Sequence, residues 1–222
     1  MEHELWFYAL IVVVGYFVGS LQFAYFVGKI IGKIDIREHG SGNAGTTNVY
    51  RVMGVRNGLI VLFFDLLKTM IPILILHIVL YGQPWGLNNL EGFEPNGIQY
   101  FPGMMMGFGA VLGHCFPFYL KFRGGKGVAC VIGMVIMFNP YVLAIVLTIS
   151  AVIVVATRFV SLASTTGFIS LAAVTTYLYA DAVAIVILMW LLAALGMYTH
   201  RKNIYWLLTG QERRFNFKRS KT

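Results

Sequence analysis

Apolar segments long enough to cross a lipid bilayer recur along almost the whole chain, and they constrain the fold more than any other feature. A membrane-spanning helix needs about 20 predominantly apolar residues. We predict seven spans, near residues 5–32, 57–81, 102–117, 126–139, 141–157, 161–180 and 182–199. The sequence therefore predicts an all-α integral membrane protein with seven transmembrane helices, in which residues 1–222 form a single polytopic domain.

The composition supports this class, and the distribution of charge orients the chain. Of the 222 residues, 58% are hydrophobic and 12% are charged, which excludes a soluble globular protein. Under the seven-span arrangement one side carries almost all of the cations: Lys29, Lys33, Arg37, Arg51, Arg56, Lys121, Arg123, Lys126, Arg158, Arg201, Lys202 and the tail 213–221. The opposite side carries no lysine or arginine, and its charged residues are Glu2, Glu4, Glu91, Glu94 and Asp181. Because basic loops stay in the cytoplasm, we expect the N-terminus outside and the C-terminus inside. The net charge of +8 then reflects this bias and contact with membrane lipid, not a nucleic-acid partner.

The loop from Gly40 to Arg51 is unusually rich in glycine, hydroxyl and amide residues for a membrane loop. Glycines let backbone N–H groups approach a ligand closely, and hydroxyl and amide side chains add hydrogen bonds. The polar side chains in question are Ser41, Asn43, Thr46, Thr47 and Asn48, beside Gly42. Arg51 adds a guanidinium that matches phosphate or carboxylate. The loop is therefore predicted to bind a small anion at a membrane face.

A second polar segment, from Gly113 to Ala129, meets the membrane on the same predicted side. Gly124, Gly125 and Gly127 flank Lys126 where a new helix is expected to begin. Backbone N–H groups at a helix N-terminus, next to a lysine, form a typical anion site. The alternative is an ordinary positively charged loop with glycine turns.

Two shorter polar segments follow, also on the predicted cytoplasmic side. Hydroxyl residues cluster between Thr157 and Thr166, where helix capping is the simpler interpretation of Ser161 taken alone. His200 and Asn203 lie almost one helical turn apart at the end of the last span, and His200 is a candidate catalytic or orienting group.

Asp65 and Lys68 are three residues apart within the second predicted span, so they can meet on one helical face. Ionisable side chains at this depth are costly and are expected to face the interior of the bundle. We expect a structural ion pair that supports the loop nearby.

Several other site classes are not supported by the sequence. Residues 40–45 match the pattern G-x-G-x-x-G, but no βαβ unit surrounds them, and the spacing around Lys126 is not that of a nucleotide-binding P-loop. No His, Cys or carboxylate pattern indicates a metal. We therefore expect no cofactor, and no obligate protein partner is evident.

The polar segments together resemble the PlsY family of bacterial acyl-phosphate:glycerol-3-phosphate acyltransferases. The similar segments are 35–51, 113–129, Ser161 to Ser164 and His200 to Ile204 with Gly210 and Glu212, in matching order and spacing. The resemblance implies seven transmembrane helices in the bacterial inner or plasma membrane, with the active site at the cytoplasmic face. It also implies transfer of a fatty acyl group from acyl phosphate to the sn-1 hydroxyl of glycerol 3-phosphate, which yields lysophosphatidic acid and phosphate. Thr69, Tyr205 and Trp206 depart from the family pattern.

The resemblance also implies roles for individual residues. Those assigned to catalysis are His200, Lys126, Arg51 and Ser41; those assigned to substrate binding are Gly42, Asn43, Thr46, Thr47, Asn48, His114, Gly124, Gly125, Gly127, Ser161, Ser164 and Asn203. The sequence leaves open whether His200 or a substrate phosphate oxygen accepts the hydroxyl proton. No carboxylate is evidently placed to tune the histidine, which favours the substrate.

The sequence gives less support to two rival functions. A transporter or channel for glycerol 3-phosphate or phosphate would be expected to show internal repeats and polar sites near the bilayer midplane, and the sequence shows neither. A coenzyme A-dependent acyltransferase of the soluble type would carry a His-x-x-x-x-Asp pair, and none occurs.

Overall fold

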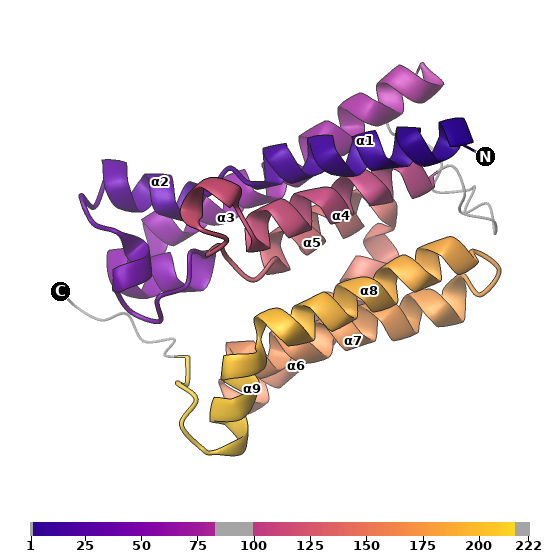
Figure 1. Ribbon diagram of the computed structural model, residues 1–222. Coiled ribbons are helices and arrows are strands. Elements are labelled where there is room, and N and C mark those ends of the chain that lie inside the picture. The colour runs from indigo at the N-terminus through magenta and orange to yellow at the C-terminus, as the bar shows by residue number, and fades with distance from the viewer. Residues whose placement is uncertain (1, 83–99, 216–222) are drawn as a thin grey trace. The chain divides into compact units, whose positions relative to one another are not determined.

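The computed structural model describes residues 2–82 and 100–215, with side chains from Leu5 onward. The described residues are helical and contain no strand. The chain divides into two compact units, Met1–Asn139 and Pro140–Thr222 (Figure 1). The first contains α1 (Glu2–Gly19), α2 (Phe23–Ile30), η1 (Ile36–Glu38), α3 (Thr46–Tyr81), α4 (Phe101–Cys115), η4 (Phe118–Leu120) and α5 (Val128–Phe138). The second contains α6 (Pro140–Thr157), α7 (Val160–Leu178), α8 (Val183–Thr199) and α9 (Arg201–Leu208).

Each predicted apolar span corresponds to helical structure. Among the described residues, five helical segments are long and apolar enough to cross a membrane, or six if α8 and the sharply bent α9 count as one span. The 11-residue helix α5 is apolar but shorter than a usual span. The short helix α9 was not predicted, because the segment after the last span is polar. The predicted loop between residues 83 and 100 and the end of the basic tail lie almost wholly outside the described residues.

The first predicted span is interrupted, which the sequence analysis did not anticipate. Helix α1 ends at Gly19 and α2 begins at Phe23, and the residues between them are Ser20, Leu21 and Gln22. An apolar run does not reveal such a break, because its polar backbone groups are satisfied by side chains from elsewhere in the unit.

Helix α3 begins eleven residues earlier than the predicted start at 57 and bends at Gly54. Gly54 has φ of 84° and ψ of 176°, a conformation that glycine adopts readily. The bend separates a short polar segment, residues 46–53, from the apolar remainder of the helix. Arg51 lies on this short segment, before the bend.

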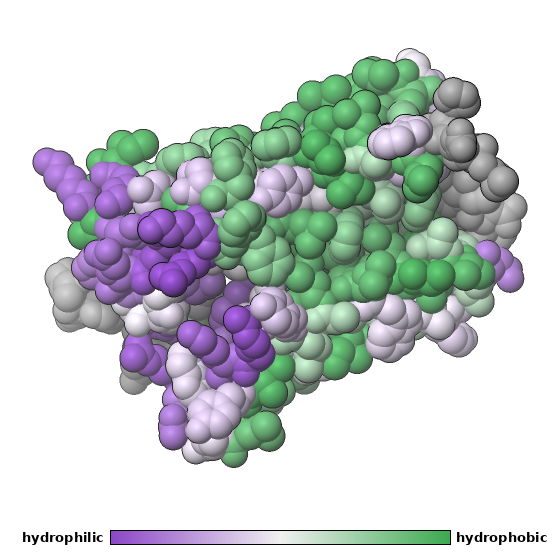
Figure 2. Space-filling view, viewed as in Figure 1, coloured by the Kyte–Doolittle hydropathy of each residue, from purple (hydrophilic) through white to green (hydrophobic). Residues whose placement is uncertain are grey.

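Helices α1 and α4 form the most extensive contact of the first unit, and glycines on both helices permit it. A Cβ at Gly15 or Gly19 would overlap the backbone of α4, and one at Gly109 or Gly113 would overlap the backbone of α1. Small residues at these positions let the two helix backbones approach closely. Figure 2 shows hydrophobic residues along most of α1 and hydrophilic residues gathered at the end of this unit that holds α2 and the loop after it.

In the second unit, α7 contacts α6, α8 and α9, and α9 also contacts α8. The helix interfaces bury Leu171, Leu188 and Leu192. Gly196 of α8 lies directly against the ring of Phe168 on α7, where a Cβ would overlap the ring. The buried residues Ser161, His200 and Asn203 lie near the start of α7 and the junction of α8 with α9.

Candidate functional site

The glycine-rich loop is folded around the buried side chain of Asn48. Its Oδ1 accepts a hydrogen bond from Ser41 N at 2.8 Å. Its Nδ2 donates to the carbonyl oxygens of Ile36 and His39, both at 3.0 Å. Gly40 has φ of +64°, and a Cβ there would overlap Asn48 Oδ1. The buried Asn48 side chain therefore fixes the conformation of the loop through three hydrogen bonds.

The exposed part of this loop is followed by the N-terminus of α3. Ser41 and Gly42 are exposed, and Asn43 is half-buried. Gly45 is the N-cap of α3 and makes no side-chain capping bond, and the first turn, which starts with Thr46 and Thr47, carries no acidic residue. Among the described residues, Thr46 Oγ1 is buried without a hydrogen-bond partner. This arrangement can accept an anion, because the first N–H groups of a helix have no partner within the helix.

An ion pair braces the segment before the loop. Both carboxylate oxygens of Asp35 accept from the Arg37 guanidinium, at 3.0 and 2.7 Å. These bonds lower the pKa of Asp35 to about 2, so the pair persists at neutral and mildly acidic pH. Arg37 also donates to the carbonyl of Leu120 at 3.4 Å and lies over the ring of Tyr25. The first loop is thereby tied to the second.

The second glycine-rich segment folds back onto the C-terminus of α4. Gly124 N donates to the carbonyl of Cys115 at 3.2 Å, and Gly125 N donates to that of His114 at 3.0 Å. These bonds satisfy two carbonyls that a helix end leaves without a partner. A Cβ at Gly124 would overlap His114 O, so this return requires glycine.

Gly125 lies where the two loops meet. A Cβ at this position would overlap His114 Nε2 on one side and lie 2.8 Å from Ala44 O of the first loop on the other. Gly127 then caps α5 with φ of +86° and no side-chain capping bond, and Lys126 is half-buried between the two glycines. The first unit thus brings the glycine loops before α3 and α5 into contact, each next to a cation predicted from the sequence.

The second unit holds a separate polar cluster around Glu212. Ser161 Oγ donates to Glu212 Oε1 at 2.7 Å. Asn203 Nδ2 donates to both carboxylate oxygens, at 2.9 and 3.1 Å. The capping interpretation of Ser161 is wrong: the N-cap of α7 is Phe159, without a side-chain capping bond. The Ser161 hydroxyl donates instead to Glu212, which lies two positions after Gly210.

His200 is buried at the junction of α8 and α9. Its Nδ1 lies 2.9 Å from the carbonyl oxygen of Gly196. A carbonyl only accepts, so Nδ1 carries a proton. The ring also contacts Phe168 edge-on. Ser164 lies on the same helix as Ser161, but its hydroxyl donates to the carbonyl of Val160 at 2.9 Å.

The predicted residues thus fall into two groups. The structure gathers the residues of the two glycine loops in the first unit, and Ser161, Asn203 and His200 lie in the second. Sequence reasoning gave no role to Glu212, although it belongs to the similar segment, and Gly210 with φ of +71° was the available signal that the chain turns there. Within the described residues no group of three His, Cys, Asp or Glu side chains could hold a metal ion.

Comparison with known proteins identifies the family. The sequence model described as "Glycerol-3-phosphate acyltransferase" matches residues 9–210. The chain belongs to this family. A glycerol-3-phosphate acyltransferase of Halalkalibacterium halodurans is 37% identical over 216 residues, which cover 96% of this chain and 98% of the relative. One of Thermoanaerobacter pseudethanolicus is 36% identical and covers 91% of this chain and 93% of the relative.

Solved structures of PlsY, an integral membrane glycerol 3-phosphate acyltransferase, have the same fold. The glycerol 3-phosphate form matches with a TM-score of 0.79 at 34% identity, over 94% of this chain and 96% of PlsY. The lysophosphatidic acid form matches with a TM-score of 0.77. These matches confirm the resemblance found in the sequence, and they establish an all-helical, multi-pass integral membrane protein.

Proposed function

We propose that the protein transfers a fatty acyl group from acyl phosphate to the sn-1 hydroxyl of glycerol 3-phosphate, in the synthesis of phospholipids. The ester bond forms between the acyl carbonyl carbon and the hydroxyl oxygen, the bond from that carbon to the phosphate oxygen breaks, and the hydroxyl proton passes to a substrate phosphate oxygen. The products are lysophosphatidic acid and inorganic phosphate. The observation that carries the proposal is the contact between the two glycine loops at Gly125, in a chain of this family. Both substrates carry a phosphate, which such loops suit.

The chemistry requires mainly positioning and charge stabilisation, because acyl phosphate is already activated. Ser41, Arg51 and Lys126 are assigned to phosphate. Their supports are the loop residues Gly42, Asn43, Asn48, Gly124, Gly125 and Gly127, with the hydroxyls of Thr46 and Thr47 at the start of α3. The acyl chain remains in the lipid or between helices while its carbonyl reaches the membrane boundary.

In the second unit, His200 and Asn203 are assigned to glycerol 3-phosphate, with Ser161 and Ser164 as hydroxyl contacts. Glu212 holds Asn203 and Ser161 in place through three hydrogen bonds. His200 Nδ1 donates to the carbonyl oxygen of Gly196, and we assign the hydroxyl proton to a substrate phosphate oxygen.

One assay tests the reaction and its donor. Purified protein is incubated with glycerol 3-phosphate and either palmitoyl phosphate or palmitoyl-coenzyme A, and release of phosphate and formation of lysophosphatidic acid are measured. We expect product only when palmitoyl phosphate is the donor. Product formed only with palmitoyl-coenzyme A would overturn the assignment of the donor. Uptake of glycerol 3-phosphate into proteoliposomes without acylation would favour a transporter.

We also propose seven spans in one catalytic domain, with α1 and α2 as one span, the short α5 as another and the C-terminus in the cytoplasm. The support is the segregation of basic residues to one predicted side. Single cysteines placed at 90 and at 211 in a cysteine-free variant test this arrangement in intact bacterial cells. An impermeant maleimide is expected to label the first and to spare the second until the inner membrane is opened. Equal labelling of both in intact cells would contradict seven spans.

The role of His200 can be separated by two substitutions. Gln places its terminal amide near the former Nε2 and cannot act as a base, whereas Ala removes the hydrogen bond as well. If His200 positions glycerol 3-phosphate, the Gln variant should exceed the Ala variant by roughly 2- to 12-fold in kcat/KM, the value of one hydrogen bond. A general base would instead lower kcat of both variants together, by roughly 10²–10⁴-fold. Kinetics at saturating acyl phosphate distinguish the two outcomes.

A further inference from the structure

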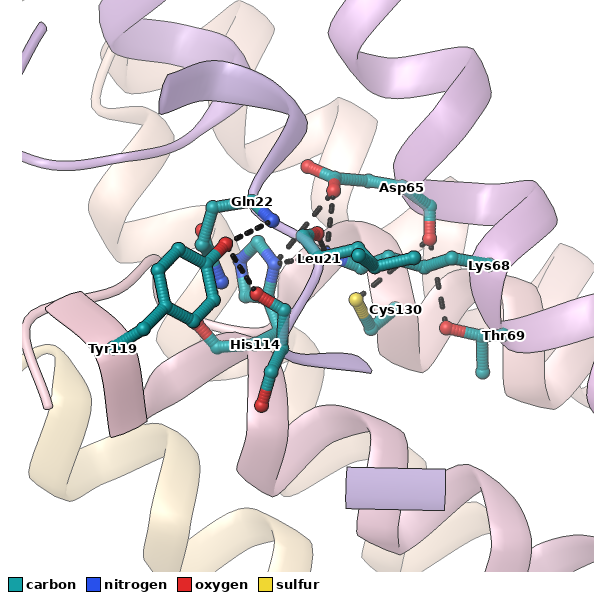
Figure 3. A network of polar contacts seen from close by, with 9 residues as sticks. Leu21, Gln22, Asp65, Lys68, Thr69, His114, Tyr119 and Cys130 are labelled. Carbon is teal, nitrogen blue, oxygen red and sulfur yellow. Dashed lines mark hydrogen bonds and ion pairs between the residues drawn. The ribbon is translucent and has the colours of Figure 1, made fainter. Parts of the chain in front are cut away.

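The break between α1 and α2 is held by polar side chains from other helices of the first unit (Figure 3). Tyr119 is bonded to both sides of it: Gln22 N donates to its hydroxyl at 3.1 Å, and the hydroxyl donates to Ser20 O at 2.9 Å. Gln22 Nε2 donates to the carbonyl of His114 at 2.7 Å. Lys68 Nζ, from α3, donates to Leu21 O at 2.7 Å. The interruption is therefore a fixed part of the structure.

Lys68 is the centre of this network and is 5% exposed. Its ammonium group donates hydrogen bonds to Leu21 O at 2.7 Å and to His114 Nδ1 at 2.9 Å. It also forms an ion pair with Asp65 Oδ1 at 2.8 Å. The predicted ion pair between Asp65 and Lys68 is confirmed, and it reaches the helix break and His114 as well.

This arrangement fixes the protonation of His114. Because Lys68 donates to Nδ1, that nitrogen presents its lone pair, and the ring proton is on Nε2. The same residue supports the second glycine loop in two ways. Its carbonyl accepts from Gly125 N at 3.0 Å, and its Nε2 lies against Gly125, where a Cβ would overlap it. Lys126 follows directly.

We propose that Lys68 and Asp65 are positioning residues for the reaction: Lys68 orients the His114 ring through Nδ1, and the ring sets the Gly124–Gly127 loop that carries Lys126. Asp65 holds the ammonium group in place. This gives His114 a supporting role instead of the direct substrate contact expected from the sequence. The inference deepens the proposed function and rests on it for its kinetic tests.

Two substitutions at His114 distinguish support through Nδ1 from substrate contact through Nε2. The Asn amide lies near the former Nδ1 and keeps an acceptor for Lys68, whereas the Gln amide lies near the former Nε2. We expect His114→Asn to retain kcat/KM within about threefold, and His114→Gln to lose roughly 10- to 100-fold through displacement of the loop. Gln equal to or better than Asn would overturn the proposal, and so would full activity of both.

A second pair of variants leaves His114 unchanged and separates positioning from simple charge compensation. Lys68→Met leaves Asp65 buried without its partner and is expected to destabilise the protein, whereas Asp65→Leu with Lys68→Met removes both charges and is expected to fold. If Lys68 positions the loop, the folded double variant remains at least about tenfold less active than wild type. Recovery of full activity in the double variant would show that the network only balances charge, and would overturn the proposal.

The protonation of His114 can be measured without any assay of turnover. Nitrogen-15 spectra of histidine-labelled protein, with His114→Asn to assign the signal, are expected to show a neutral ring with its proton on Nε2. A proton on Nδ1 would overturn the proposal even in an active enzyme. Conversely, an inactive wild-type protein with the expected tautomer would reject the proposed reaction and leave the network standing.

Discussion

Arg51→Ala and Lys126→Ala should each lower kcat/KM by roughly 10- to 150-fold while the protein remains folded. Both cations are assigned to phosphate, and a charge-assisted hydrogen bond contributes about 1.5–3 kcal/mol. Arg51 is exposed and Lys126 is half-buried, so neither side chain fills the apolar interior of the first unit. The measurement is phosphate release at varied concentrations of both substrates, after size-exclusion chromatography has verified the fold.

Arg56→Ala is a matched control for these two variants. Arg56 is exposed, lies five positions beyond Arg51 on α3, and follows the bend at Gly54. Its removal takes the same charge from the same region and should change kcat/KM by less than about twofold, since surface substitutions usually cost little. If Arg56→Ala were as damaging as Arg51→Ala, the general positive potential and not a specific contact would explain the loss. Folded Arg51 and Lys126 variants with wild-type activity would remove these residues from the site.

Gly125→Ala should reduce turnover by about 100-fold or more, because the added methyl group has nowhere to go. It would overlap His114 Nε2 and lie 2.8 Å from the backbone oxygen of Ala44, so one of the two loops must move. Displacement of either loop separates the residues that are assigned to phosphate. The measurement is kcat/KM for glycerol 3-phosphate, together with the thermal unfolding temperature in detergent.

Gly82→Ala is the control for this substitution. Gly82 follows α3 with φ of +71°, and no atom of the described residues lies within 4 Å of a Cβ built there. The backbone strain should cost about 1–2 kcal/mol of stability without an effect on turnover. If Gly125→Ala resembled Gly82→Ala, with lower stability and normal kcat/KM, the contact between the loops would not matter for the reaction.

Hydropathy located the helices well, because lipid exposure demands a nearly continuous apolar run. It could not locate the break at residues 20–22 or the start of α3 at Thr46. The break depends on polar groups whose partners are distant in sequence: Leu21 O and Lys68 Nζ are separated by 47 positions. The hydropathy of a segment indicates whether it faces lipid or water, and it contains no information about such hydrogen-bond partners.

Glycine and charge patterns predicted which loops are special, but not how each side chain is used. Asn48 was expected to bind substrate, and the structure shows its amide engaged with Ser41, Ile36 and His39. Ser161, taken alone, was interpreted as a helix cap, and it donates to Glu212. In both cases the residue type correctly indicated a hydrogen bond, whereas the partner depends on the tertiary structure.

The ion pair between Asp65 and Lys68 also has a consequence for how the protein is made. Insertion of a lone Asp or Lys at the centre of a helix costs about 2.5–3.5 kcal/mol on the scale set by the cellular translocon. Because the two residues lie on one face of α3, their 2.8 Å contact requires only that this helix has formed. His114 is synthesised 46 residues after Lys68, too late to help at that stage. The second transmembrane segment can therefore enter the lipid as an almost neutral helix, and its ammonium group is already in place when the remaining acceptor arrives.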